Sequence, residues 1–275
     1  MSIEPRLTVA LVQTLSRIDL EALLTRFGAV FVDEGHHLPA ASFLVPIGSL
    51  PAKYHLWCSA TPKWEDGLTR MVLAAGGPVI YTINQEDLPT LKPLLVIVET
   101  PYTGYIDPNN YPEMLNKLTQ NRTRNSLIVK TITREAAGHY TLVLSERIDH
   151  LAILKDMLTK VLLKMSIEIL TRNIPKRKRL EIITKARNKQ VDILLTTQLA
   201  REGLDLPHLD RLFLVTPKRA GNAVEQEIGR IKRPCQNKHD AVIFDFWDTR
   251  NPVFKAQFWK RQAVLDGCSW PKFIS

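Results

Sequence analysis

The strongest constraint on the fold is a repeated alternation between short apolar runs and amphipathic segments of helical length. Runs such as Ala29–Asp33 and Val191–Thr196 are rich in apolar residues, and segments such as Asp149–Leu163 place apolar residues every three or four positions. Strands that alternate with helices are joined by crossover connections, which makes them parallel in a sheet covered by helices on both faces. The sequence therefore predicts an α/β fold built on parallel sheets.

The predicted strands form two sets. The first set comprises Leu7–Gln13, Ala29–Asp33, Tyr54–Ser59, Pro78–Ile83 and Leu94–Thr100, and the second comprises Tyr140–Ser145, Ser166–Leu170, Val191–Thr196, Arg211–Thr216 and Ala241–Phe246. Between them, residues 100–112 are polar and interrupted by prolines, as is typical of a linker. A long helical segment is predicted after it, over residues 113–137. We therefore predict one domain over residues 1–104 and a second over residues 105–275.

Charge is distributed unevenly along the 275 residues, whose net charge is +9. Residues 1–110 contain 7 Lys and Arg against 11 Asp and Glu, whereas the remainder contains 30 against 17. A basic half suits a polyanionic partner such as nucleic acid, although ordinary solubility explains the charge equally well. Three cysteines are too few for a disulfide framework, which favours an intracellular setting. No apolar run approaches the roughly 20 residues of a membrane span, so no membrane partner is predicted.

Two acids follow one of the predicted strands. Asp33 and Glu34 come directly after four apolar residues, and open α/β sheets bind their ligands at the carboxyl ends of the strands. One carboxylate there can hold Mg²⁺ through its water shell, and the other can accept a proton from an attacking water. A polar strand end with surface histidines explains the same residues. Ser59 and Thr61 end the next strand, where their hydroxyls could relay hydrogen bonds.

The basic half carries two further candidate segments. Thr196 and Thr197 end a strand, and a turn of this kind can hold a nucleic-acid phosphate. Asp205, in the loop that follows, could accept a hydrogen bond from a ribose hydroxyl. Arg230 and Arg233 are three positions apart, so on a helix they share one face and can clamp a γ-phosphate. A solvated basic helix is the alternative for this arginine pair.

Taken in order, these segments resemble the conserved motifs of superfamily 2 helicases, and their surroundings are similar to the XPB-like branch. Motif II of the DExH type, motif III, motif V and motif VI are matched by Asp33–His36, Ser59–Thr61, Thr196–Pro207 and Gln226–Arg233. The segment Leu142–His150 and the pair Arg124-Asn125 also fit the pattern of that branch. The resemblance covers about residues 7–265.

The resemblance implies two RecA-like, P-loop NTPase-type domains with parallel sheets, which use ATP and Mg²⁺. Implied catalytic roles are Mg²⁺ coordination through water by Asp33, general base catalysis by Glu34, a link from His36 to Gln226, and γ-phosphate contact by Gln226, Arg230 and Arg233. Implied coupling residues are Ser59 and Thr61, and implied nucleotide contacts are Gly203 and Asp205. Implied nucleic-acid contacts are Gln13, Thr14, Thr196 and Thr197.

One part of the helicase pattern is missing. A P-loop requires Gly-Lys-Ser/Thr, and none of the 12 glycines is followed by lysine. In the resembling family this motif precedes motif II, so we expect an incomplete first domain with an exposed sheet edge. We also expect the chain alone to hydrolyse ATP poorly.

The function predicted from the sequence is that of an ATP-dependent DNA helicase or translocase core. Its partners would be DNA and a polypeptide that supplies the P-loop half, in the cytoplasm or on the nucleoid. The alternative is a non-catalytic nucleic-acid-binding fragment or one half of a split helicase. A third hypothesis, the motor segment of a restriction enzyme, ranks lower because no cluster of acids and lysine typical of a nuclease follows residue 250.

Overall fold

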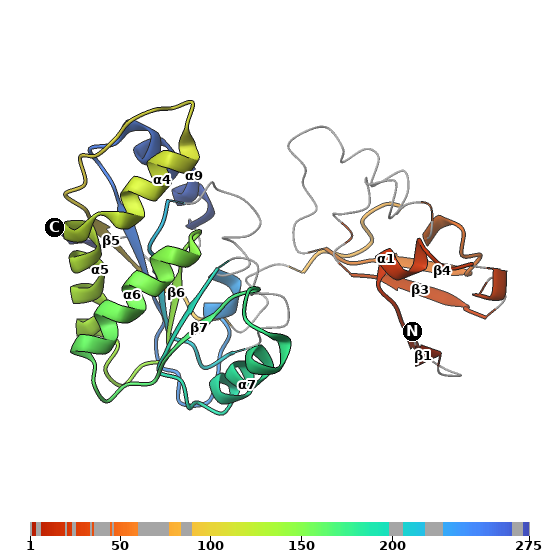
Figure 1. The fold of residues 1–275 in the computed structure, drawn as a ribbon. Coiled ribbons are helices and arrows are strands. Elements are labelled where there is room, and N and C mark those ends of the chain that lie inside the picture. The colour runs from red at the N-terminus through yellow and green to blue at the C-terminus, as the bar shows by residue number, and fades with distance from the viewer. Residues whose placement is uncertain are drawn as a thin grey trace. The chain divides into compact units, whose positions relative to one another are not determined.

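The computed structural model describes residues 2–3, 7–19, 21–23, 26–33, 35, 45, 47–59, 77–83, 90–197, 206–217, 228–265 and 272–274. The chain divides into two compact units, which we call unit 1 (residues 1–84) and unit 2 (residues 85–275) (Figure 1). The division lies after residue 84 and not between residues 104 and 105 as predicted. Within the described residues, no helix combines the length and the apolar character needed to cross a membrane.

Unit 2 is built on a seven-stranded sheet in which every pairing is parallel. The strand order is β11-β5-β10-β9-β6-β8-β7. The strands are β5 (Leu94–Glu99), β6 (Thr141–Leu144), β7 (Ile167–Leu170), β8 (Ile193–Thr196), β9 (Arg211–Leu214), β10 (Val242–Trp247) and β11 (Lys272–Ile274). This arrangement confirms the predicted α/β class with a parallel sheet.

Helices cover both faces of this sheet. They are α4 (Tyr111–Gln120), α5 (Arg122–Glu135), α6 (Ile148–Val161), α7 (Lys176–Arg187) and α9 (Pro252–Leu265). Neighbouring residues of β10 belong to different cores, because side chains alternate along a strand. Phe244 lies in the core with α5 and α6, and Ile243 lies in the core with α7 and α9.

The helix predicted over residues 113–137 is in fact two helices. Asn121 separates them with an extended backbone, at φ −70° and ψ 114°. Its side-chain oxygen accepts a hydrogen bond from the backbone N–H of Arg124 at 2.9 Å, which satisfies a donor at the start of α5. The periodic apolar pattern continues across the break, so it could not reveal a cap of this kind.

β5 explains why the division between the units differs from the prediction. Its six residues pair with β10, from Leu94 opposite Val242 to Glu99 opposite Trp247. Leu95, Val96, Ile97 and Val98 are all buried, as expected for a strand covered on both faces. The polar segment that we predicted to link two domains instead connects β5 to α4 within unit 2.

The described part of unit 1 contains two small pairings. β1 (Ser2–Ile3) and β2 (Thr8–Val9) are antiparallel, whereas β3 (Ala29–Val32) and β4 (Tyr54–Trp57) are parallel. A short helix, α1 (Val12–Leu15), and a 3₁₀ turn over Glu21–Leu23 also belong to it.

Two of the strand predictions for unit 1, those for residues 7–13 and 78–83, are wrong. Only Thr8 and Val9 of the predicted strand Leu7–Gln13 pair, and the backbone then turns into α1, where Thr14 donates to Leu11 at 2.9 Å. Residues 78–83 form no strand. Val79, Ile80 and Tyr81 are 64%, 77% and 79% exposed, so apolar composition alone did not produce a buried strand there.

Candidate functional site

The carboxyl edge of the unit 2 sheet is lined by buried hydroxyl groups. Because all the strands are parallel, their carboxyl ends meet at one edge, where α/β proteins bind ligands. The residues there are Thr100 after β5, Ser145 after β6, Thr171 after β7, Thr196 and Thr197 at the end of β8, and Thr216 after β9. Each is at most 7% exposed. This edge is therefore a polar floor, which contains two of the residues predicted to contact nucleic acid.

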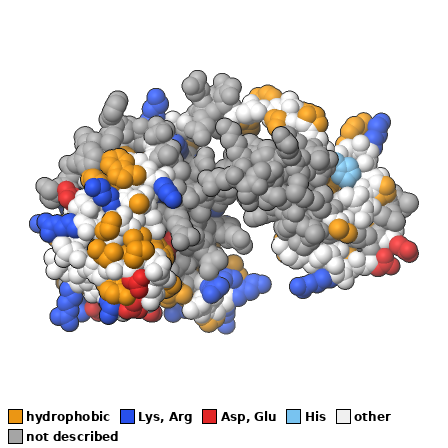
Figure 2. All heavy atoms as spheres, turned by 90° about the horizontal axis from the view of Figure 1, so that it is seen from above, with side chains coloured by type: hydrophobic (Ala, Val, Ile, Leu, Met, Phe, Trp, Pro, Cys, Tyr) orange, Lys and Arg blue, Asp and Glu red, His pale blue; other side chains and the backbone are white. Residues whose placement is uncertain are grey.

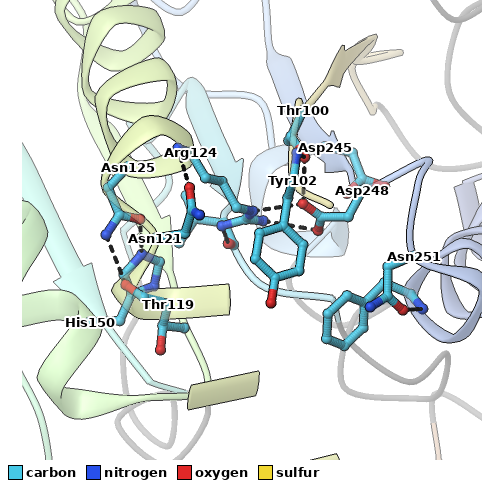
Figure 3. Close-up of polar contacts among 12 residues, drawn as sticks. Thr100, Tyr102, Thr119, Asn121, Arg124, Asn125, His150, Asp245, Asp248 and Asn251 are labelled. Atoms are coloured by element: carbon cyan, nitrogen blue, oxygen red, sulfur yellow. Dashed lines mark hydrogen bonds and ion pairs between the residues drawn. The ribbon is translucent and has the colours of Figure 1, made fainter. Parts of the chain in front are cut away.

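A buried ion pair joins this edge to α5. The guanidinium of Arg124 donates from Nε to Asp248 Oδ1 at 2.7 Å and from Nη2 to Asp248 Oδ2 at 3.2 Å (Figure 3). Its Nη1 donates to the carbonyl of Val215 at 2.9 Å, and the hydroxyl of Thr100 also donates to Asp248. Both charged side chains are 0% exposed. The pair thus binds α5 to the ends of β5, β9 and β10 by strong charge-assisted bonds.

A second chain of hydrogen bonds runs beside it through His150. Asn125 donates from Nδ2 to the carbonyl of Thr119 at 2.8 Å, so its Oδ1 accepts from His150 Nε2 at 3.0 Å. The proton of the neutral ring is then on Nε2, and Nδ1 accepts from the hydroxyl of Ser145 at 3.0 Å. Burial, followed by the charge of Arg124, lowers the pKa of His150 to about 3. His150 is therefore neutral at physiological pH.

This chain ends at the turn between β6 and α6. The Ser145 hydroxyl accepts from the backbone N–H of Arg147 at 3.2 Å, and the Thr216 hydroxyl accepts from the N–H of Glu146 at 3.0 Å. Arg147 donates to the carbonyl of Pro112 at 3.1 Å. The turn is consequently held by side chains of the carboxyl edge.

The helicase resemblance drew attention to Arg124 and Asn125 but did not predict which residues they contact. The sequence analysis assigned no role to Asp248. An acid that directly follows a predominantly apolar strand, β10, was the available signal for Asp248. It parallels the signal that drew attention to Asp33.

The predicted phosphate-binding turn begins inside the sheet. The Thr196 side chain is 0% exposed, and its hydroxyl donates to the carbonyl of Leu170 at 2.6 Å. That bond links β8 to β7 and occupies the hydroxyl proton. Thr197 is also buried, at 7% exposure. The predicted nucleotide contacts, Gly203 and Asp205, lie outside the described residues.

Arg230 and Arg233 belong to a helical turn that packs on the core of unit 2. Residues 228–231 are helical, and Ile228 and Ile231 are 2% and 3% exposed. Arg230 is partly exposed and Arg233 is exposed, and the N–H of Arg233 donates to the carbonyl of Arg230 at 3.2 Å. We call residues 228–233 the arginine turn. Gln226 lies outside the described residues.

In unit 1, two of the described candidates lie at the carboxyl edge of a parallel strand pair. Asp33 follows β3 and Ser59 lies shortly after β4, and both are exposed. The pairing extends past the strands, because Cys58 donates to the carbonyl of Val32 at 2.9 Å and Gly35 donates to that of Cys58 at 2.8 Å. A carboxylate and a hydroxyl at such an edge suit Mg²⁺ bound through water. The predicted base Glu34, together with His36 and Thr61, lies outside the described residues.

The other two predicted contacts of unit 1 lie in a helix and not in a strand. Gln13 is exposed and Thr14 is partly buried, both within α1.

A cluster resembling a metal site lies at the opposite edge of the unit 2 sheet. His139, Asp210 and Asp240 bring one ligand atom each to within 4.8 Å of one another. The guanidinium of Arg211 already donates to His139 Nε2 at 2.9 Å and to Asp240 Oδ1 at 3.0 Å. His139 Nδ1 lies 2.8 Å from Asp210 Oδ2, so both acids and the histidine already have protein partners.

Comparison with known proteins matches a part of unit 2 that includes Arg124 and His150 but not Asp248. Residues 123–235 match the helicase conserved C-terminal domain. A protein named as a helicase from Sulfolobus islandicus filamentous virus is 28% identical over 82% of this chain and 43% of its own length. One named as an ATP-dependent RNA helicase from Acanthamoeba polyphaga mimivirus is 26% identical over 90% of this chain and 49% of its own length. The chain thus spans about half the length of the curated relatives it matches.

Solved structures agree on the fold. A fragment named as an HsdR subunit of a type I restriction enzyme from Vibrio vulnificus has a TM-score of 0.68 at 19% identity, covering 90% of this chain and 48% of that one. Dbp5 of S. cerevisiae, bound to RNA and ADP BeF3, has a TM-score of 0.62 at 12% identity, covering 91% and 60%. At these identities the likeness concerns the fold alone, which for unit 2 is that of a RecA-like helicase C-terminal domain.

Proposed function

We propose that this chain belongs to the superfamily 2 helicases and forms part of an ATP-driven nucleic-acid motor. The match of residues 123–235 to the helicase C-terminal domain and the relatives named as helicases support this proposal. The observation that carries the proposal is the parallel sheet within and around residues 123–235, whose carboxyl edge is a floor of buried hydroxyls held by Arg124 and Asp248. A rigid edge of this kind holds in place the loops that follow the strands, which suits repeated binding and release of a phosphate backbone by those loops.

The chemistry that we assign to the motor of which this chain forms part is phosphoryl transfer from ATP to water. ATP would supply the anhydride, and Mg²⁺ would neutralise the charge that develops on its phosphates. Asp33 would hold the metal through water, and Glu34 would accept a proton from the attacking water. Arg230 and Arg233 would bind γ-phosphate oxygens, as paired guanidiniums in a helical turn can do.

The nucleic acid that we propose is DNA, bound mainly through its phosphates. The basic balance of residues 111–275 supports a polyanionic partner. Figure 2 shows lysine and arginine side chains at several places among the coloured residues of the drawn face. Contacts from such side chains to phosphates do not depend on base sequence. One relative is named as an RNA helicase, so RNA is the competitor that the test must include.

The proposal is tested by measuring phosphate release from ATP in the presence of Mg²⁺, with single-stranded DNA, single-stranded RNA or no nucleic acid. The variant Glu34→Gln is measured in parallel. DNA-stimulated release that is lost in the variant supports the motor. Stimulation by RNA alone would overturn the DNA assignment. A Lys255→Met variant serves as a control, because Lys255 is exposed on α9.

The second candidate function is nucleic-acid binding without hydrolysis by this chain alone. It is motivated by the lack of any Gly-Lys pair among the 275 residues, beside a unit 2 whose sheet and core are well formed. In the same assay it predicts DNA binding without phosphate release. Adding a polypeptide that carries a Gly-Lys-Thr segment would then restore release, if that polypeptide is the proposed partner.

A further inference from the structure

Lys238 makes a set of contacts that the proposed mechanism does not use. Its ammonium donates to three backbone carbonyls, those of Ile231 at 2.6 Å, Arg233 at 3.0 Å and Pro207 at 3.2 Å. Two of these acceptors belong to the arginine turn. The third belongs to the segment that enters β9, directly after the predicted nucleotide contacts. One side chain thus bonds to two stretches of chain that are far apart in the sequence.

The backbone carbonyls of residues 231–233 need hydrogen-bond donors from outside the helical turn. They follow a helical turn, and the last carbonyls of a helix have no partner within it. The Lys238 ammonium donates to two of them, those of Ile231 and Arg233, and the N–H of Leu91 donates to the one between, that of Lys232, at 2.9 Å. Leu91 packs against the same core as Ile228 and Ile231. The arginine turn is therefore anchored by apolar packing on one side and by three hydrogen bonds at its end.

A tight turn of the backbone precedes Lys238. Asn237 has a φ of +67°, in the left-handed region that asparagine tolerates better than most residues. The backbone N–H of Lys238 donates to the carbonyl of Cys235 at 3.1 Å, which closes the turn. An ammonium, with three donors, can meet the three carbonyls at once.

We propose that Lys238 is a positioning residue, which fixes the arginine turn relative to Pro207 and the chain that enters β9. The arginines' role at a γ-phosphate rests on the proposed function, whereas the clamp itself rests only on the contacts above. A clamp of this kind keeps Arg230 and Arg233 in one orientation, so that binding a phosphate does not first require the turn to be ordered.

The test compares wild type with Lys238→Met, Lys238→Arg and the control Lys255→Met. Methionine keeps the length of the side chain without its donors, and arginine restores donors. Hydrogen exchange is measured at the amides of Lys232 and Arg233 in the turn, Leu91 before β5, and Phe213 in the sheet core. We expect Lys238→Met to exchange about tenfold faster at the first three amides and unchanged at Phe213, with Lys238→Arg close to wild type.

The functional arm measures binding of a fluorescent ATP analogue and of single-stranded DNA to the same proteins. Lys238→Met should weaken nucleotide binding about as much as Arg230→Gln and leave DNA affinity within about twofold, with recovery in Lys238→Arg. Unchanged exchange at Lys232 and Arg233 in folded Lys238→Met overturns the proposal, as does acceleration that extends equally to Phe213. If wild type binds no nucleotide, the proposed function fails, while the exchange data still decide the clamp.

Discussion

Acidification should destabilise unit 2 through one identifiable side chain, His150. Its pKa is lowered by burial to about 3 in the folded protein, against about 6.5 in an unfolded chain. The folded state holds the neutral ring, so this group's contribution to stability is complete above pH 6.5. That contribution is lost as pH falls from 6.5 towards 3, because the unfolded state gains a proton that the folded state does not.

The magnitude follows from the two pKa values. Each pH unit within that window costs about 1.4 kcal/mol, so the free energy of unfolding should fall by about 2 kcal/mol between pH 7.5 and pH 5 from His150 alone. Nε2 and Nδ1 are both engaged, by Asn125 and Ser145. A doubly protonated ring would therefore lose its bond from the Ser145 hydroxyl.

Urea unfolding followed by circular dichroism, on wild type and His150→Gln at several pH values from 7.5 to 5, measures this effect. The variant should be less stable at pH 7.5 by about 1 to 3 kcal/mol, since it disturbs buried hydrogen bonds. Its disadvantage should shrink by about 2 kcal/mol at pH 5, because the groups that titrate in both proteins cancel in the difference. A difference that stays constant over the whole pH range would refute the assignment of a neutral, buried His150.

Three further outcomes are expected. Asp248→Asn removes the charge opposite the buried guanidinium of Arg124 and should lower the free energy of unfolding by about 3 kcal/mol in urea titrations. A decrease in the free energy of unfolding near zero would contradict the buried ion pair. Thr196→Val should lower the free energy of unfolding by about 1 kcal/mol by the same method, because it removes the hydrogen bond to Leu170. The same variant should leave DNA affinity within about twofold of wild type. A large loss of DNA affinity would instead support a direct phosphate contact by Thr196. DNA binding followed by fluorescence anisotropy should weaken steeply between 50 and 200 mM salt, and a salt-independent affinity would argue against phosphate recognition.

The order of chemical groups along the chain carried most of the correct inferences. Apolar strands that alternate with helices indicated a parallel sheet, and the strands β6 to β10 formed close to their predicted positions. The reason is that a strand buried on both faces is predominantly apolar, which the sequence records directly. The helicase resemblance likewise depends on local segments, and residues 123–235 match the helicase C-terminal domain.

The errors arose where a segment's partner, and not its own composition, decides its state. Leu94–Glu99 has the same apolar character in either unit, and its pairing with β10 placed it in unit 2. Residues 78–83 are apolar yet form no strand.

The sequence by itself determined the fold class of unit 2 and drew attention to Arg124, Asn125 and the arginine pair. Only the tertiary structure showed that Arg124 is paired with Asp248, 124 positions away. It alone showed that Thr196 is occupied by a cross-strand bond, and that Lys238 holds the end of the arginine turn. Local pattern follows from backbone geometry and burial within a few residues. The partners of a polar group depend on which distant segments the sheet brings to the same edge. The spacing of residues along the chain does not say which segments these are.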